Sequence, residues 1–236
     1  MRKEEFLKSI DSKILKDSIM QEAYSKENLN KEIIKNHTFS TGTTTVGLTC
    51  KDAVVLGTDK RATMAYFIAS KTAEKLHKIQ EHCYCTIAGS VADAQYLVEI
   101  LRAESSIYQL NKNKPIPVKA AGRMLSNILY RYKLFPFEVG LILGGVTEDE
   151  GPVLLDIGPY GSILPEKFVA VGSGQNFSLG VLEAKYKDNL TPEEGKEIVK
   201  KAVTSSIIRD MASGNGIDLA IIKKDGPAER EFIPIK

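Results

Sequence analysis

The chain has 236 residues, of which 43% are hydrophobic and 26% are charged, and its formal net charge is +2. This composition is ordinary for a soluble globular protein, and the near-neutral charge argues against a surface dedicated to nucleic acid or to an anionic membrane. No apolar run approaches the ~18 residues of a membrane span, and the N-terminus lacks the apolar centre of a secretory signal, so we expect a cytoplasmic protein.

The N-terminal region differs in composition from the rest of the chain. The first 41 residues contain neither glycine nor proline, and Gly42 is the first glycine. Helical spacing of apolar residues over positions 1–35 predicts an amphipathic helix or a dynamic segment, and the Thr, Ser and Asn content of positions 36–42 predicts an extended, accessible approach to Gly42. We therefore predict a prosegment over residues 1–42, removed on maturation, and one packed domain over residues 43–236.

Beyond Gly42 the sequence predicts strands, two helices, strands, two more helices and a last strand. The expected strands are Thr43–Cys50, Ala53–Thr58, Cys83–Ala88, Val139–Val146, Val153–Ile157, Lys167–Val171 and, as the last, Ile217–Ile222. The expected helices are Ser90–Asn111, Val118–Tyr132, Gln175–Tyr186 and one that opens at Thr191-Pro192-Glu193-Glu194 and closes at Ser213-Gly214. This grouping predicts an α+β fold, a four-layer α/β/β/α sandwich of two antiparallel sheets flanked by helix pairs.

Local signals predict how several elements begin. Lys51-Asp52 predicts a tight hairpin between the first two strands. Thr191 and Glu194 form a capping-box pattern with a proline at the first helical position. Ser90 is expected to cap the helix after it, with one apolar face made of Val91, Ala94, Leu97, Val98, Leu101, Ile107 and Tyr108.

Cysteine and nucleotide motifs give little support for a cofactor. Cys50, Cys83 and Cys85 are an odd number in apolar runs, which suits reduced core thiols better than a disulfide framework. With His82 alongside, Cys83 and Cys85 could be half of a metal site, but the sequence offers no second ligand pair downstream. The sequence also lacks a phosphate-binding glycine loop and an H-E-x-x-H zinc motif. We expect neither a metal nor a cofactor.

Thr43 is the first candidate for catalysis. Threonine is common in strands, so three in a row at Thr43-Thr44-Thr45 would ordinarily reflect β propensity alone. Thr43, however, directly follows the first glycine, at the change of composition. If the Gly42–Thr43 bond is cut, one residue supplies both a hydroxyl nucleophile and an α-amine that can act as a general base.

Other polar candidates have ordinary structural explanations when each is considered alone. Asp59 would be a solvated turn residue at a strand end, and Lys75 would be one more surface lysine. Ser173 would be a loop residue or a helix cap. Asp210 and Ser213 would be the polar end of a helix. Only their combination suggests a shared function.

Five segments together resemble the archaeal-type proteasome β subunit over residues 43–236. They are Gly42-Thr43-Thr44-Thr45-Val46-Gly47, Asp59-Lys60-Arg61-Ala62-Thr63, Thr86-Ile87-Ala88-Gly89, Gly172-Ser173-Gly174 and Arg209-Asp210-Met211-Ala212-Ser213-Gly214. The resemblance implies the N-terminal-nucleophile hydrolase fold and seven-membered rings of β subunits flanked by proteasome α subunits. It further implies an ATP-dependent unfoldase as regulator and polypeptides as substrates, with neither nucleic acid nor membrane as a partner.

The resemblance also implies a role for each candidate. Thr43 would be the nucleophile, with its freed amine accepting the proton directly or through water. Lys75 would favour the deprotonated hydroxyl by its charge, and Asp59 would hold Lys75 as an ion-pair partner. The other implied site residues are Ser173, Asp210 and Ser213, which would orient the amine, and Gly89, whose N–H would be an oxyanion-hole donor.

A substrate pocket is implied by the same resemblance. Ile87 at its floor would favour large apolar side chains before the cleaved bond. His77 either widens acceptance toward acidic or polar side chains or is simply a partly exposed histidine packed at a strand end. Thr63 and Val91 would pair with the main chain of an extended substrate. The implied pocket residues are Ala62, Ala73, His77, Ile87, Val91 and Gln95.

The implied function is a threonine endopeptidase that degrades unfolded proteins. The precursor would be a zymogen until Thr43 attacks the Gly42 carbonyl, and glycine would suit this autocatalytic cleavage because it tolerates backbone conformations that bring that carbonyl to the hydroxyl. Two alternatives stay open, namely a structural ring subunit that keeps its prosegment and depends on another β subunit, and an amidohydrolase acting on small amides. The prosegment is long for archaeal members, which leaves a role in assembly or in the timing of activation open.

Overall fold

The computed structural model describes residues 42–64, 66–224 and 226–235, so the predictions for residues 1–41 lie outside the described part of the chain. The strands are β1 (Thr44–Thr49), β2 (Ala53–Asp59), β3 (Ala62–Met64), β4 (Phe67–Ser70), β5 (Leu76–Gln80), β6 (Cys83–Gly89), β7 (Val139–Thr147), β8 (Gly151–Ile157), β9 (Ile163–Pro165), β10 (Phe168–Gly172), β11 (Ile217–Lys223) and β12 (Glu229–Ile233). The helices are α3 (Val91–Lys112), α4 (Val118–Arg131), α5 (Gln175–Lys185) and α6 (Pro192–Arg209).

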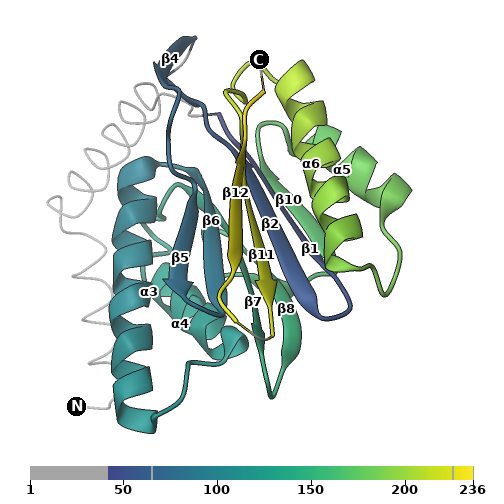
Figure 1. Ribbon diagram of the computed structural model, residues 1–236. Coiled ribbons are helices and arrows are strands. Elements are labelled where there is room, and N and C mark those ends of the chain that lie inside the picture. The colour runs from purple at the N-terminus through teal and green to yellow at the C-terminus, as the bar shows by residue number, and fades with distance from the viewer. Residues whose placement is uncertain (1–41, 65, 225, 236) are drawn as a thin grey trace, which may run out of the picture. The chain divides into compact units, whose positions relative to one another are not determined.

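Two five-stranded antiparallel sheets form the centre of the fold. One sheet has the strand order β10-β1-β2-β11-β12, and the other has the order β5-β6-β7-β8-β9. Strands β3 and β4 pair only with each other among the described residues. In Figure 1, α3 and α4 lie on one side of the stacked sheets and α5 and α6 lie on the other. The predicted four-layer sandwich is therefore confirmed.

Three apolar clusters fill the spaces between these four layers. The first joins α3 and α4 to the sheet of β5 to β9, and the second joins α5 and α6 to the sheet of β1. The third lies between the sheets and includes Leu56, Ile142 and Leu154. All seven residues of β2 are buried, because this strand is flanked by β1 and β11 and is covered by α6 and by the other sheet. The core thereby fixes the positions of β1 and β2, the two adjacent strands at whose ends Thr43 and Asp59 lie.

Several local predictions are confirmed. The Lys51-Asp52 hairpin forms, with the Cys50 N–H donating to the Ala53 carbonyl oxygen at 2.7 Å. The Ser90 hydroxyl accepts from the Asp93 N–H and caps α3. The capping box at Thr191 is complete, with both reciprocal hydrogen bonds present.

Other predictions were wrong. Val91 and Ile107 were expected on the buried face of α3, but they are 45% and 51% exposed, because the buried stripe runs through Ala94, Leu97, Val98, Leu101 and Ser105 instead. Helix α6 ends at Arg209 rather than at Ser213-Gly214, since Asp210 leaves the helical conformation with φ −97° and ψ 116°. Ile217–Ile222 is not the last strand, because β12 follows it.

Five strands were missed altogether. β3, β4 and β9 have only three or four residues each, too few for alternation to be recognised. β12 is an edge strand that begins with the exposed Glu229, Arg230 and Glu231, so its apolar residues are limited to Phe232 and Ile233. β5 was hidden by its polar residues His77, Lys78 and Gln80.

Candidate active site

The candidate site lies where the ends of several elements meet. Thr43 directly precedes β1, and Asp59 ends the adjacent strand β2. Lys75 directly precedes β5, in the other sheet. Ser173 follows β10, which pairs with β1 on its other side, and Asp210 follows α6. Strand pairing and sheet stacking thus bring together residues that are far apart in the sequence.

Thr43 is 4% exposed, and both of its candidate reactive groups have defined partners. Its hydroxyl donates to the Gly42 carbonyl oxygen at 2.7 Å. Its backbone N–H, which would become the α-amine after cleavage, donates to Ser173 Oγ at 3.1 Å. The hydroxyl therefore already lies against the carbonyl group of the bond predicted to be cut.

Lys75 and Asp59 form a buried ion pair beside Thr43. The distance from Lys75 Nζ to Asp59 Oδ1 is 2.6 Å, and the two side chains are 5% and 0% exposed. Lys75 Nζ also donates to the Arg61 carbonyl oxygen, which leaves one of its three N–H bonds for a further acceptor. Burial lowers the pKa of Lys75, and the Asp59 carboxylate opposes that shift. An ammonium held this way can stabilise an oxyanion on Thr43.

The Asp59 carboxylate has four hydrogen-bond donors around it. Oδ1 accepts from the Thr44 N–H at 2.9 Å and from Lys75 Nζ at 2.6 Å. Oδ2 accepts from the backbone N–H groups of Arg61 and Gly214, both at 2.9 Å. A carboxylate offers about four lone-pair directions, so Asp59 is saturated and its orientation is fixed. It is not the solvated turn residue that its position alone would suggest.

Asp210 organises a second set of hydrogen bonds. Its Oδ2 accepts from the hydroxyls of Ser173 and Ser213, both at 2.6 Å, and its Oδ1 accepts from the Ala212 N–H at 3.1 Å. Of the predicted amine-orienting residues, Ser173 contacts the Thr43 nitrogen directly. Asp210 and Ser213 act one and two hydrogen bonds further away.

Thr44 is a site residue that sequence reasoning missed. Its N–H donates to Asp59, and its hydroxyl lies 2.7 Å from Ser213 Oγ. Because the Ser213 proton is directed to Asp210, the Thr44 hydroxyl is the donor in this contact. Thr44 thus connects the Asp59 group to the Asp210 group. Its place next to Thr43 is the only sequence signal that could have indicated this role.

At Gly42 and Gly89, a side chain would clash with neighbouring atoms. A Cβ built on Gly42 would lie 1.7 Å from the Ala212 Cβ. Space against Ala212 is therefore one reason for a glycine at this position. Gly89 has φ +108°, and a Cβ there would lie 2.1 Å from the Glu138 carbonyl oxygen. Gly89 lies at the same pocket as Thr43.

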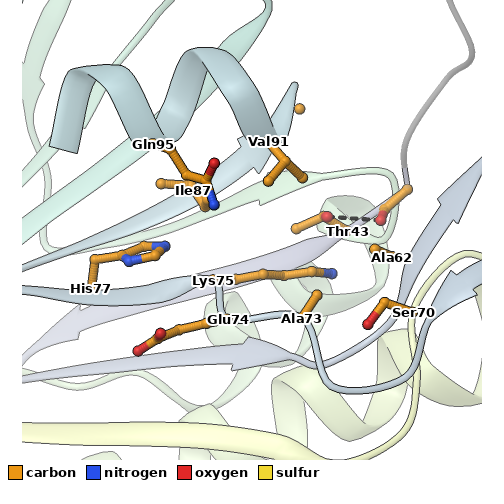
Figure 2. A pocket seen from close by; sticks show the side chains of 12 residues that line it. Thr43, Ala62, Ser70, Ala73, Glu74, Lys75, His77, Ile87, Val91 and Gln95 are labelled. Carbon is orange, nitrogen blue, oxygen red and sulfur yellow. Dashed lines mark hydrogen bonds between the residues drawn. The ribbon is translucent and has the colours of Figure 1, made fainter. Parts of the chain in front are cut away.

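A pocket of about 310 Å³ opens beside Thr43. Figure 2 shows Thr43 and the Lys75 ammonium at one end and the His77 ring at the other. Six of the predicted pocket residues line it, namely Ala62, Ala73, His77, Ile87, Val91 and Gln95. Thr63 does not line it, and its hydroxyl accepts from the Gly42 N–H at 2.9 Å. The predicted main-chain pairing of Thr63 with substrate stays a prediction. Ser70 and Glu74 also line the pocket and were missed.

His77 is buried, not a partly exposed histidine at a strand end. Its side chain comes from β5, and the residue is 8% exposed. Burial lowers its pKa, the nearby Glu74 opposes this shift, and Arg102 adds to it. The ring is consequently neutral at neutral pH.

The cysteines are buried free thiols, as predicted. Burial raises the pKa of Cys83, and it raises those of Cys50 and Cys85 to about 12. In the described part of the chain, no three His, Cys, Asp or Glu side chains come together in a group that could hold a metal ion. None of the helices in that part is long and apolar enough to cross a membrane.

Two stacked antiparallel sheets between helix pairs, with a threonine at the start of a central strand, define the fold class of the N-terminal-nucleophile hydrolases. A family model described as "Proteasome subunit" matches residues 39–222. The chain belongs to the proteasome subunit family.

Three curated relatives illustrate the similarity, and each is called a proteasome β subunit. The chain is 47% identical over 186 residues to proteasome subunit beta of Methanocaldococcus vulcanius, covering 78% of this chain and 83% of the relative. It is 44% identical over 184 residues to that of Methanothermobacter thermautotrophicus, covering 78% and 87%. It is 42% identical over 185 residues to proteasome subunit beta 2 of Nitrosopumilus maritimus, covering 78% and 88%.

Proposed function

We propose that this chain is a catalytic β subunit of a proteasome core particle, a threonine endopeptidase activated by cleavage of its own Gly42–Thr43 bond. The single observation that carries the proposal is the position of Thr43. Its hydroxyl touches the Gly42 carbonyl oxygen, its N–H meets Ser173, and the buried Lys75–Asp59 pair lies beside it. A structural subunit would have no need for a buried ammonium with a spare donor at this place.

Autocleavage would proceed on the groups already in contact. Thr43 Oγ1 adds to the Gly42 carbonyl carbon, the C–N bond breaks, and the acyl group moves to the oxygen as an ester while the nitrogen takes up the proton. Water then hydrolyses the ester, which releases residues 1–42 and leaves a free amine on Thr43. Hydrogen bonding of the Thr43 N–H to Ser173 would hold the new amine in place.

The mature site would cleave peptides by the same chemistry. The Thr43 amine takes the hydroxyl proton, directly or through water, while Oγ1 attacks the substrate carbonyl. Lys75 stabilises the developing negative charge on Oγ1, and the Gly89 backbone would stabilise that on the substrate oxygen. Unfolded polypeptides would reach the site inside β-subunit rings flanked by α-subunit rings, supplied by an ATP-dependent unfoldase in the cytoplasm.

The test is the intact mass of the chain in the assembled particle, measured together with hydrolysis of a fluorogenic peptide. The wild type should begin at Thr43, and Thr43→Ala should keep its prosegment and lose hydrolysis. Thr49→Ala, at the far end of β1, serves as the matched control and should be processed and active. A wild-type chain that still carries its prosegment in the assembled particle would favour the structural-subunit alternative. Full activity in Thr43→Ala would exclude the threonine mechanism.

A further inference from the structure

The two ends of the substrate pocket differ in how their polar atoms are satisfied. At the Thr43 end, Lys75 has Asp59 and a backbone carbonyl as partners. At the other end, the His77 Nε2 atom is buried and has no hydrogen-bond partner among the described residues. The His77 ring faces into the pocket in Figure 2, with Ile87 across from it.

An unpartnered buried nitrogen has a cost, and a ligand can remove it. Leaving a buried polar group without a hydrogen bond destabilises the protein, because the group has lost its water partners and gained none in return. A site that contains such a group discriminates against ligands that cannot pair with it. The side chain that enters this pocket can therefore gain by carrying a polar atom at the depth of His77.

Charges around the pocket narrow the chemistry of that atom. An acidic side chain would meet a neutral imidazole and the Glu74 carboxylate. A basic side chain would meet the Lys75 ammonium, with Arg102 and Arg230 also acting on the His77 end. Arg230 Nη2 lies 3.5 Å from Glu74 Oε1, which offsets the acidity of the rim. A neutral group fits this balance best.

The walls require an apolar body behind the polar tip. Ala62, Ala73 and Ile87 line the pocket, and none of them offers a polar side-chain atom. A phenol satisfies both demands, because its ring is apolar and its hydroxyl can donate or accept. It can therefore pair with Nε2 in either neutral tautomer of the imidazole.

We propose that His77 makes this pocket select tyrosine over phenylalanine at the residue before the cleaved bond, through a hydrogen bond between the tyrosine hydroxyl and His77 Nε2. The inference rests on the proposed peptidase function and adds a specificity determinant to it. A net hydrogen bond of about 0.5–1.5 kcal/mol corresponds to a preference of roughly 2- to 13-fold.

The experiment compares kcat/KM of the mature assembled particle for two fluorogenic peptides that differ only by Tyr or Phe before the leaving group. The wild type should favour the Tyr peptide by roughly 2- to 13-fold. His77→Leu should abolish or reverse that ratio while still cleaving the Phe peptide. His77→Gln, which keeps a hydrogen-bonding group at the position, should retain part of the preference.

Two results would overturn the proposal, and neither resembles failure of the peptidase function. Equal kcat/KM values for the two peptides in the wild type would show that no stabilising hydrogen bond forms between the tyrosine hydroxyl and His77 Nε2. An unchanged ratio in His77→Leu would show that another residue sets the preference. If the peptidase function itself were wrong, neither peptide would be cleaved by the wild type, or both would still be cleaved by Thr43→Ala.

Discussion

The proposed catalytic end of the pocket, around Thr43 and Lys75, and its proposed specificity end, around His77, differ in how their polar atoms are paired. At the catalytic end Asp59 accepts four hydrogen bonds and Asp210 accepts three, so the polar atoms hold one another. At the specificity end His77 Nε2 has no partner in the described structure. Catalytic groups need a fixed geometry before the substrate arrives. A residue that selects the substrate instead needs an unpaired hydrogen-bonding atom with which the substrate can pair.

The comparison makes the catalytic end the more fragile of the two, and Asp59→Asn is its severest test. An amide has one acceptor oxygen, so two of the four donors would lose their partner and Lys75 would lose its counter-charge. Breaking a buried pair costs about 3–5 kcal/mol. We expect peptide hydrolysis by the assembled particle to fall roughly 150- to 5000-fold, with processing of the prosegment, measured by intact mass, equally impaired.

A matched ion pair outside the site provides the control for this variant. Lys60 Nζ lies 2.7 Å from Asp218 Oδ2, and these side chains are 16% and 11% exposed. Asp218→Asn also removes one partner of an ion pair but leaves Thr43 and its neighbours intact. Hydrolysis should stay within about 10-fold of the wild type. Equal losses of hydrolysis in Asp59→Asn and Asp218→Asn would mean that the Lys75–Asp59 pair matters for stability alone and not for catalysis.

The next largest effect is expected at Gly42, where space rather than hydrogen bonding is critical. Gly42→Ala would bring its Cβ to 1.7 Å from the Ala212 Cβ unless the chain shifts. Displacing a reacting group by about 1 Å can cost roughly 100-fold in rate. We therefore expect cleavage of the prosegment, followed by intact mass over time, to slow about 10- to 100-fold.

A second substitution separates this steric explanation from any other. Ala212→Gly removes the clashing methyl group while keeping the backbone N–H that donates to Asp210. The single variant Ala212→Gly should process normally, and the double variant with Gly42→Ala should recover most of the wild-type rate. Persistent slow cleavage in the double variant would contradict the steric account.

A smaller effect is expected at Ser173, which holds the Thr43 nitrogen. Ser173→Ala removes the acceptor at 3.1 Å and one donor to Asp210. Loss of a hydrogen bond to a charged group costs about 1.5–3 kcal/mol, so kcat should fall about 10- to 100-fold. KM should change little, because Ser173 does not line the substrate pocket. Ser106→Ala, on the exposed side of α3, is the control and should leave both constants unchanged; a rise in KM alone for Ser173→Ala would argue against an orienting role.

Much of this site could be predicted from the sequence because its residues sit in short segments of recognisable type. Gly42 and Thr43 mark a change in composition, and Asp59 ends an evident strand. The roles of Thr44 and Ala212 could not be predicted, since each depends on a loop packed against β1 from a distant part of the chain. His77 was placed in the pocket by resemblance, but its unpaired Nε2 is a property of packing that no sequence pattern encodes.

The smallest expected effect is on the pH dependence of stability, because the folded protein keeps the buried His77 ring neutral. Burial lowers the pKa of His77 from its ordinary value of 6.5, against the opposing charge of Glu74 and with the help of Arg102 and Arg230. Below about pH 6.5 the unfolded chain therefore binds a proton that the folded chain does not, and stability is lost as the pH falls through this range. Unfolding temperatures measured from about pH 8 to about pH 5 should fall for the wild type and fall less for His77→Leu. Parallel curves for the two proteins would mean that His77 takes up a proton equally well in the folded and unfolded states. The specificity end of the pocket would then be solvated, and His77 Nε2 would not need a partner from the substrate.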